Sequence, residues 1–272
     1  MSPIGVFDSG FGGLTILKDL RRALPGADFL YLGDNARAPY GTRSFELVYR
    51  FTLEAVKHLF EQGCPLVILA CNTASAKALR SIQQRDLAGI DPTRRVLGVI
   101  RPTVEAIAGA TRTGSVGLFA TPGTVASQSY DIEIAKHAPG VTVYSHACPM
   151  WVPLVENSEA DGDGADYFVK KDIDALFRPN PDIDTLILGC THYPILLNKI
   201  KKYVPDGVRI LSQGEIVAAS LLDYLQRHPD MNERISRGAS VRYLTTESPE
   251  KFDCLASEFM QDDVRSSTVR LG

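Results

Sequence analysis

Two cysteines in this chain each stand at the end of an apolar segment and just before polar residues. The segment Leu66–Ser75 reads LVILACNTAS, and Leu186–Pro194 reads LILGCTHYP. We interpret each as a buried strand that ends at a cysteine, Cys71 or Cys190, where a helix begins. A helix N-terminus lowers the pKa of a thiol, so both could act as acids or bases near neutral pH. Two such thiols could remove a proton from one face of a small substrate and return one to the other.

Further polar residues follow other expected strands. Ligands of open α/β sheets bind beyond the carboxyl ends of the strands, so side chains at these ends should share one rim. His192, two residues after Cys190, could exchange protons with it. Simpler roles stay open, since Asp8 could only form a turn and Asn72 could only cap a helix. The rim would hold Asp8, Ser9, Gly10, Gly33, Asp34, Asn35, Cys71, Asn72, Thr73, Thr121, Pro122, Gly123, Cys190, Thr191 and His192.

Composition restricts the class of protein. The chain has 272 residues, is 44% hydrophobic and 22% charged, and carries a net charge of -3. This charge gives no basic surface for nucleic acid or for an anionic membrane. We see neither a signal peptide nor an apolar stretch of roughly 20 residues that could cross a bilayer, and we expect a cytoplasmic protein. The five cysteines form no C-x-x-C pair, which argues against disulfides and a structural zinc site.

Short apolar runs alternate with amphipathic helical segments along the whole chain. Continuous apolar strands between helices are typical of parallel sheets covered on both faces, so we predict an α/β fold. The expected strands are 4–7, 29–32, 66–70, 96–99, 115–119, 141–144, 185–188, 208–211 and 241–245. The clearest expected helices are 12–24, 44–62, 74–84 and 249–260.

The chain also repeats itself. Ile4–Gly10 resembles Val116–Pro122, at nearly the same spacing as the two cysteine strands. A shared spacing indicates an internal duplication. We therefore predict two similar α/β domains, with residues 1–94 plus 207–272 in the first and residues 95–206 in the second.

Five blocks, taken in order, resemble the glutamate racemases of the cofactor-independent aspartate/glutamate racemase superfamily. The resemblance extends from residue 4 to about residue 215, and all five blocks in order are highly specific. The blocks are DSGFGGLT at Asp8–Thr15, LGDNARAPYGTRS at Leu32–Ser44, ACNTAS at Ala70–Ser75, ACPMWVPLVE at Ala147–Glu156 and LGCTHYP at Leu188–Pro194.

The resemblance implies racemisation of L- and D-glutamate in a cleft between two pseudo-twofold related domains, to supply D-glutamate for peptidoglycan. Cys71 and Cys190 would exchange the Cα proton, assisted by Asp8 and His192 respectively. Asp34 and Glu156 match acidic positions with secondary roles. The resemblance implies no cofactor, a homodimer, and glutamate as the small-molecule partner, and we expect no metal. The substrate would contact Asp8, Ser9, Pro39, Tyr40, Gly41, Asn72, Thr73, Thr121, Thr191 and His192.

Several alternatives remain at this stage. No lysine stands in a persuasive setting for a pyridoxal phosphate Schiff base, and the glycines after Asp8 lack dinucleotide-binding spacing. A metal site from His146, Cys148 and His192 is conceivable but lacks the usual ligand spacing. Related thiol chemistries are aspartate racemisation, maleate isomerisation and arylmalonate decarboxylation, although the decarboxylase pattern keeps only one of the two cysteines. A binding protein that clamps an amino acid without chemistry would need neither thiol.

Overall fold

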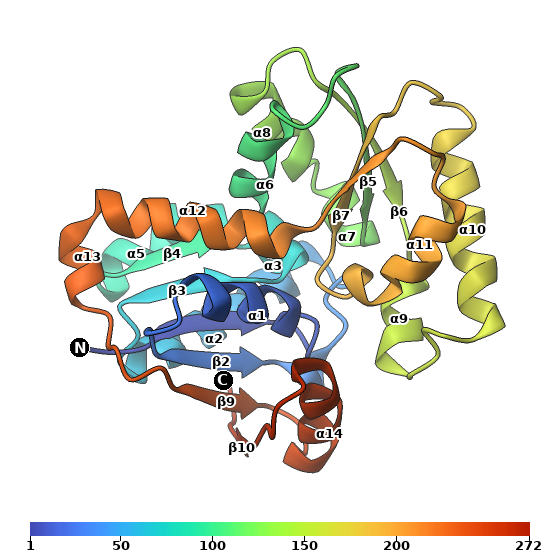
Figure 1. Cartoon of the computed structure of the whole chain (residues 1–272). Coiled ribbons are helices and arrows are strands. Elements are labelled where there is room, and N and C mark those ends of the chain that lie inside the picture. Colours follow the sequence, from blue (N-terminus) through green and yellow to red (C-terminus); the bar gives the residue numbers. More distant parts are fainter.

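The protein is an α/β structure with two parallel sheets flanked by helices (Figure 1), as the sequence predicts. The computed structural model describes residues 1–272. None of its helices combines the length and the apolar character needed to cross a membrane.

The first sheet has the strand order β10-β9-β2-β1-β3-β4, and every neighbouring pair is parallel. Its central strands are buried along their full length, which explains their unbroken apolar sequences. The strands are β1 (Ile4–Asp8), β2 (Phe29–Gly33), β3 (Leu66–Leu69), β4 (Arg95–Gly98), β9 (Val241–Thr245) and β10 (Ser266–Thr268).

The second sheet repeats the central arrangement of the first. Its order is β6-β5-β7-β8, which matches β2-β1-β3-β4 strand by strand, again with parallel pairing throughout. β3 and β7, the two strands that lead to the cysteines, therefore hold corresponding places. This repeated order supports the internal duplication. The strands are β5 (Ser115–Ala120), β6 (Thr142–Ala147), β7 (Thr185–Gly189) and β8 (Arg209–Leu211).

Helices cover both faces of each sheet, because successive residues of a strand point to opposite faces. In β1, Val6 packs into the cluster that contains α1 and α12, whereas Phe7 packs into the cluster that contains α2. In the second sheet, α6 and α8 cover one face and α9, α10 and α11 the other. These helices are α1 (Leu14–Ala23), α2 (Phe45–Glu61), α6 (Ile100–Ile107), α8 (Ser129–His137), α9 (Trp151–Glu156), α10 (Asp163–Phe177), α11 (Leu197–Tyr203) and α12 (Gln213–Arg227).

The remaining helices are short, with one exception. The chain after β3 is helical from α3 to α5 through a π-helical stretch at Ile82–Asp86, so this segment is longer than expected from the sequence. The last helix, α14, has the bounds that the sequence predicts. These elements are α3 (Asn72–Lys77), α4 (Leu79–Ser81), α5 (Leu87–Ile90), α7 (Pro122–Ala126), α13 (Pro229–Glu233) and α14 (Pro249–Met260), with 3-10 turns at Asn35–Arg37 and Tyr193–Leu196.

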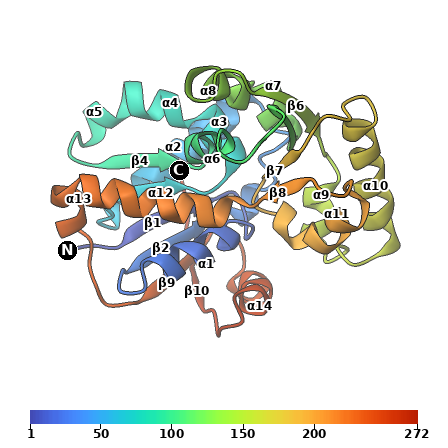
Figure 2. The ribbon, with the colours of Figure 1, turned by 45° about the horizontal axis from the view of Figure 1, so that its top comes forward.

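The strand pairings correct both expected domain boundaries. β4 pairs with β3 in the first sheet, with Arg95 opposite Leu66, although residue 95 was expected to open the second domain. β8 pairs with β7 in the second sheet, although residues after 206 were assigned to the first. Each half completes its fourth strand before the chain crosses over, and α12 then returns along the first sheet (Figure 2). We propose domains of residues 1–98 plus 212–272 and 99–211.

Candidate active site

One pocket lies where the carboxyl ends of β1, β3, β5 and β7 meet, and both domains contribute to its wall. Cys71 and Cys190 both line it, each just past the end of its strand. Most of the residues that the sequence places on a common rim therefore line this pocket. The lining residues are Ser9, Ala38, Pro39, Tyr40, Gly41, Thr42, Cys71, Asn72, Thr73, Thr121, Pro122, Cys148, Pro149, Val152, Pro153, Glu156, Cys190, Thr191 and His192.

Cys71 is the N-cap residue of α3, as expected. The pKa of its thiol, however, differs from the expectation. Its sulfur accepts a hydrogen bond from the Ala74 N–H at 3.4 Å, and its thiol donates to the Ser9 hydroxyl at 3.5 Å. Burial, followed by the negative charge of Asp8, raises the pKa of the Cys71 thiol to about 12. The expectation of a lowered pKa is thus wrong for Cys71, because the loss of solvation on burial is the largest cause of the shift.

Cys190 lies at one end of a chain of three side chains. His192 Nδ1 is 3.9 Å from Cys190 Sγ, and His192 Nε2 is 2.6 Å from Glu156 Oε1 at the end of α9. Burial alone would lower the pKa of His192, but the hydrogen bonds and charges of Cys190 and Glu156 raise it well above its usual value. His192 can therefore hold a proton beside Cys190. Glu156, assigned only a secondary role from the sequence, contacts His192 directly.

Asp8 and Asp34 do not line the pocket, although both are fully buried. Asp8 accepts hydrogen bonds from the Gly10 N–H at 3.0 Å and from the Thr191 hydroxyl at 3.3 Å. Burial raises the pKa of the Asp8 carboxyl, while the charge of His192 acts in the opposite direction. Asp8 therefore lies behind the lining residues, within hydrogen-bond distance of Thr191, which lines the pocket.

Asp34 holds a pocket residue in place. Its carboxylate accepts hydrogen bonds from the Tyr40 hydroxyl, from Arg37 Nε at 2.7 Å and from the Thr246 hydroxyl at 2.8 Å. Tyr40 is itself buried and lines the pocket together with Pro39 and Gly41. Asp34 therefore orients this part of the wall.

Asn72 belongs to a buried hydrogen-bond network that the sequence did not reveal. Its amide nitrogen donates to Gln213 Oε1 at 2.5 Å, and its amide oxygen accepts from the Tyr130 hydroxyl at 2.8 Å. Gln213 Nε2 also lies 2.9 Å from the Thr103 hydroxyl. Gln213 starts the helix after β8, so the rule of strand ends could have found it. Tyr130 lies within a helix, where no sequence signal marks it.

The threonines and glycines at the rim bring the two domains together. The hydroxyls of Thr73 and Thr121 lie 2.9 Å apart across the domains. A Cβ added at Gly12 would lie 2.4 Å from His192 Nδ1 and 2.7 Å from Thr191 Oγ1. A side chain at Gly12 would therefore collide with the Cys190 loop, which explains a glycine here better than nucleotide binding does.

Of the three residues considered for a metal site, His146 and Cys148 lie together, whereas His192 is not in that group. His192 pairs with Glu156, whereas His146 Nε2 lies 3.1 Å from Asp172 Oδ1. Cys148 lines the pocket with Cys71 and Cys190.

A two-sheet α/β protein with a thiol at corresponding strand ends and one pocket between them has the arrangement of a proton-transfer enzyme. The comparisons agree with this class. The family model for Asp/Glu/hydantoin racemases matches residues 4–221. A glutamate racemase of Ruegeria sp. strain TM1040 is 42% identical over 271 residues, covering 96% of this chain and 97% of that protein.

Solved structures give the same result. Glutamate racemase isoform RacE1 of Bacillus anthracis superimposes with a TM-score of 0.89 at 35% identity, covering 99% of this chain and 97% of that one. The glutamate racemase of Francisella tularensis gives a TM-score of 0.86 at 33% identity, with coverage of 99% and 97%. The chain therefore belongs to the Asp/Glu/hydantoin racemase family. It is an amino-acid racemase, an isomerase, and its relatives are glutamate racemases.

Proposed function

We propose that this enzyme interconverts L- and D-glutamate by moving the Cα proton between Cys71 and Cys190. The observation that carries the proposal is that both thiols, at corresponding ends of β3 and β7, line one small pocket. The racemase of Francisella tularensis was solved in complex with D-glutamate, which supports glutamate as the substrate here. No cofactor takes part in the proposed reaction.

The two thiols would work in opposite directions. By resemblance to the family, Cys190 takes the proton from L-glutamate and Cys71 delivers one to the other face of Cα, and the reverse reaction begins at Cys71. His192, which binds Cys190 and Glu156, would hold the proton that Cys190 gives up before each L-glutamate turnover. One proton leaves Cα and one returns, so the substrate changes configuration without any other bond being broken.

The high pKa of Cys71 fits the role of the acid in the conversion of L-glutamate to D-glutamate. With a pKa of about 12, Cys71 is a thiol at neutral pH and can donate its proton. In the reverse direction it must become a thiolate. The substrate ammonium would bring a positive charge into the pocket, and a nearby opposite charge lowers the pKa of a thiol. Substrate binding would thus prepare Cys71 to act as the base.

The developing carbanion is the difficult species in this reaction. The pocket offers hydrogen-bond donors at Ser9, Thr73 and Thr191, which would hold the substrate carboxylates. Fixed donors in a site that excludes water stabilise developing negative charge more strongly than solvent does. The other contacts proposed for the substrate are Pro39, Tyr40, Gly41, Asn72, Thr121 and His192, with Asp8 and Asp34 acting from beneath.

The wider role also follows from the resemblance. We propose that the product D-glutamate serves peptidoglycan synthesis, and that the enzyme works in the cytoplasm as a homodimer. Light scattering of the purified chain at assay concentrations would test the dimer, because a monomer at full activity would contradict it.

A deuterium-exchange experiment tests the reaction itself. The enzyme is incubated without cofactor in D2O with L-Glu, D-Glu, L-Asp or D-Asp, and both optical rotation and the Cα proton signal are followed. We expect racemisation and exchange with both glutamate enantiomers. Exchange with aspartate alone would identify aspartate, rather than glutamate, as the substrate. Binding without exchange would indicate a binding protein. No reaction with either glutamate enantiomer would refute the proposal.

Variants of the two cysteines test the two-thiol mechanism in the same assay. Cys71→Ser and Cys190→Ser should each slow racemisation by about 10²- to 10⁴-fold, the usual contribution of a general acid or base. Cys254→Ser is the matched control, because Cys254 is an exposed free thiol. Wild-type racemisation by either active-site variant would exclude the mechanism.

A further inference from the structure

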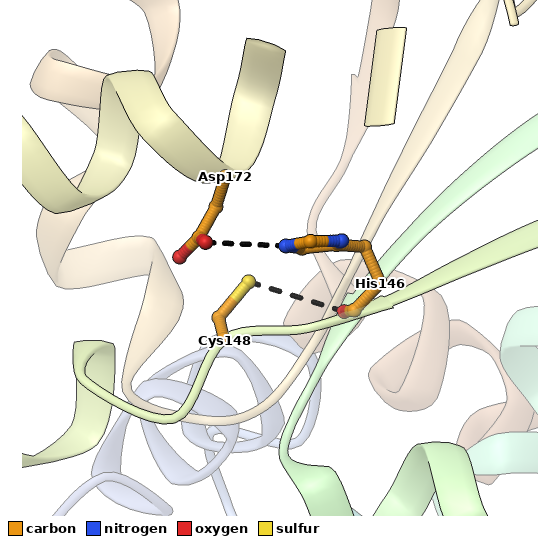
Figure 3. Close-up of side chains that lie close together, drawn as sticks. All are labelled: His146, Cys148 and Asp172. Carbon is orange, nitrogen blue, oxygen red and sulfur yellow. Dashed lines mark hydrogen bonds and ion pairs between the residues drawn. The ribbon is translucent and has the colours of Figure 1, made fainter. Parts of the chain in front are cut away.

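A second group of metal-ligating side chains lies apart from Cys71 and Cys190, and one of its members, Cys148, lines the pocket. His146 is near the end of β6, Cys148 follows that strand, and Asp172 reaches them from α10 (Figure 3). The imidazole, thiol and carboxylate point toward one another, and their ligand atoms all lie within 4.8 Å of each other.

The charge of Asp172 lacks a permanent counterion. The residue is only 6% exposed, and its ion-pair partner is His146, at 3.1 Å, rather than a lysine or an arginine. A buried carboxylate is costly unless it is neutralised, so this cluster favours a cation.

We propose that His146, Cys148 and Asp172 bind one thiophilic divalent cation of the Zn²⁺ type. A tetrahedral zinc holds its ligands at about 2.0 Å for nitrogen and oxygen and about 2.3 Å for sulfur, which sets them roughly 3.3–3.5 Å apart. The His146–Asp172 pair at 3.1 Å is already close to this spacing. The thiol releases its proton to solvent as the Zn–S bond forms, and the two charges of the cation then balance one thiolate and one carboxylate.

This site would connect zinc to activity. Three protein ligands leave a fourth coordination position open, as in zinc sites that exchange ligands. Cys148 lines the same pocket as Cys190 and Glu156. A cation bound to Cys148 would therefore stand at the pocket wall, where it would compete for the substrate carboxylates. Zinc should therefore inhibit the racemisation proposed above. This inhibition rests on the proposed function, whereas zinc binding can be tested without it.

Binding is measured on the full-length chain carrying Cys71→Ser and Cys190→Ser, so that the active-site thiols cannot take the ion. Equilibrium dialysis should give one Zn²⁺ per chain, and Co²⁺ should give a thiolate-to-cobalt charge-transfer band. In that background, Asp172→Asn and His146→Gln should each weaken binding by about tenfold or more, because even groups that only orient a ligand contribute 10–100-fold. Circular dichroism checks that the variants fold.

Two substitutions of the same residue types serve as matched controls. Asp174→Asn changes a neighbouring carboxylate of α10, and His137→Gln changes another histidine that pairs with a carboxylate. Neither should affect binding. In the racemase assay with both cysteines present, Asp172→Asn should need about tenfold more Zn²⁺ than wild type for equal inhibition. Absence of a bound ion, or affinity unchanged in both Asp172→Asn and His146→Gln, would overturn the site. Equal inhibition of wild type and Asp172→Asn would overturn its effect on activity.

Discussion

Glu156 Oε1 lies 2.6 Å from His192 Nε2, while the other nitrogen of the same imidazole faces Cys190 Sγ at 3.9 Å. A carboxylate therefore acts on one of the two thiols through a histidine. Cys71 has no histidine partner, and its hydrogen bonds are to the Ser9 hydroxyl and from the Ala74 N–H. The two thiols are repeats in sequence but not equivalents in chemistry.

Glu156→Gln should impair the Cys190 side of the site. The glutamine can keep a hydrogen bond to His192 but loses the charge that raises its pKa, so the pKa of His192 should fall. His192 would then lose its proton at a lower pH than in wild type. Activity that needs the imidazolium would therefore also be lost at a lower pH. We expect kcat with L-glutamate to fall about tenfold, which corresponds to about 1.4 kcal/mol.

An NMR titration of His192 together with the pH profile of kcat measures this shift. Glu159→Gln is the control, because this exposed glutamate follows the same helix. An unchanged pKa for His192 in Glu156→Gln would show that the carboxylate does not act through the imidazole.

Asp8→Asn should make Cys71 more reactive toward alkylation. The charge of Asp8 helps to raise the pKa of Cys71 to about 12, so its removal should lower that pKa. At neutral pH, each unit of decrease gives about ten times more thiolate. Iodoacetamide labelling of Cys71, followed by peptide mass spectrometry, measures the rate, with the exposed Cys254 as internal reference. The exposed Asp263→Asn should leave the rate unchanged, and slower labelling in Asp8→Asn would contradict the role given to its charge.

Residues at strand ends were the most predictable part of the site. Cys71 and Cys190 could be found because an apolar run marks a buried strand, and the position after it lies on the ligand-binding edge of a parallel sheet. His192 follows from its distance of two residues to Cys190. The order of the central strands repeats because the sequence itself repeats.

Other features depend on packing that no local pattern encodes. The acidity of Cys71 could not be predicted, because the helix terminus is visible in the sequence whereas full burial beside Asp8 is not. Tyr130 lies in the first turn of α8, and only the folded arrangement brings it to Asn72. The domain boundaries were misplaced for a related reason. The sequence of a strand such as β4 does not show which of the two sheets it joins.

Gly12→Ala should reduce activity and stability together. The new Cβ would lie 2.4 Å from His192 Nδ1, so the Cys190 loop must move away. Such overpacking costs typically 1–3 kcal/mol of unfolding free energy. We expect that loss in urea denaturation and more than about a tenfold loss of kcat/KM. Gly26→Ala is the control, because a Cβ there has no neighbour within 4 Å. Wild-type activity in Gly12→Ala would show that the contact is not needed.

Gln213 and Tyr130 should be energetically coupled, because they share a buried network with Asn72 at the junction of the domains. Gln213 Nε2 lies 2.9 Å from the Tyr130 hydroxyl, which in turn donates to Asn72 at 2.8 Å. Removing either partner leaves buried polar groups unsatisfied, at a cost of about 1–3 kcal/mol. Once one is gone, removing the other should cost less. A double-mutant cycle of Gln213→Ala and Tyr130→Phe, followed by urea denaturation, should therefore give a coupling energy of about 0.5–3 kcal/mol.

The control cycle pairs Gln213→Ala with Tyr224→Phe, because Tyr224 belongs to the same helix, α12, as Gln213. Eleven residues along a helix separate these two by about 16 Å, so their effects should add to within about 0.5 kcal/mol. The same variants test whether the network serves the chemistry. Asn72 adjoins Cys71, so Tyr130→Phe should also slow exchange of the D-glutamate Cα proton, which begins at Cys71, more than that of L-glutamate. Additivity in the first cycle would mean that the two side chains meet without stabilising each other, and equal losses in both directions would mean that the network supports the fold alone.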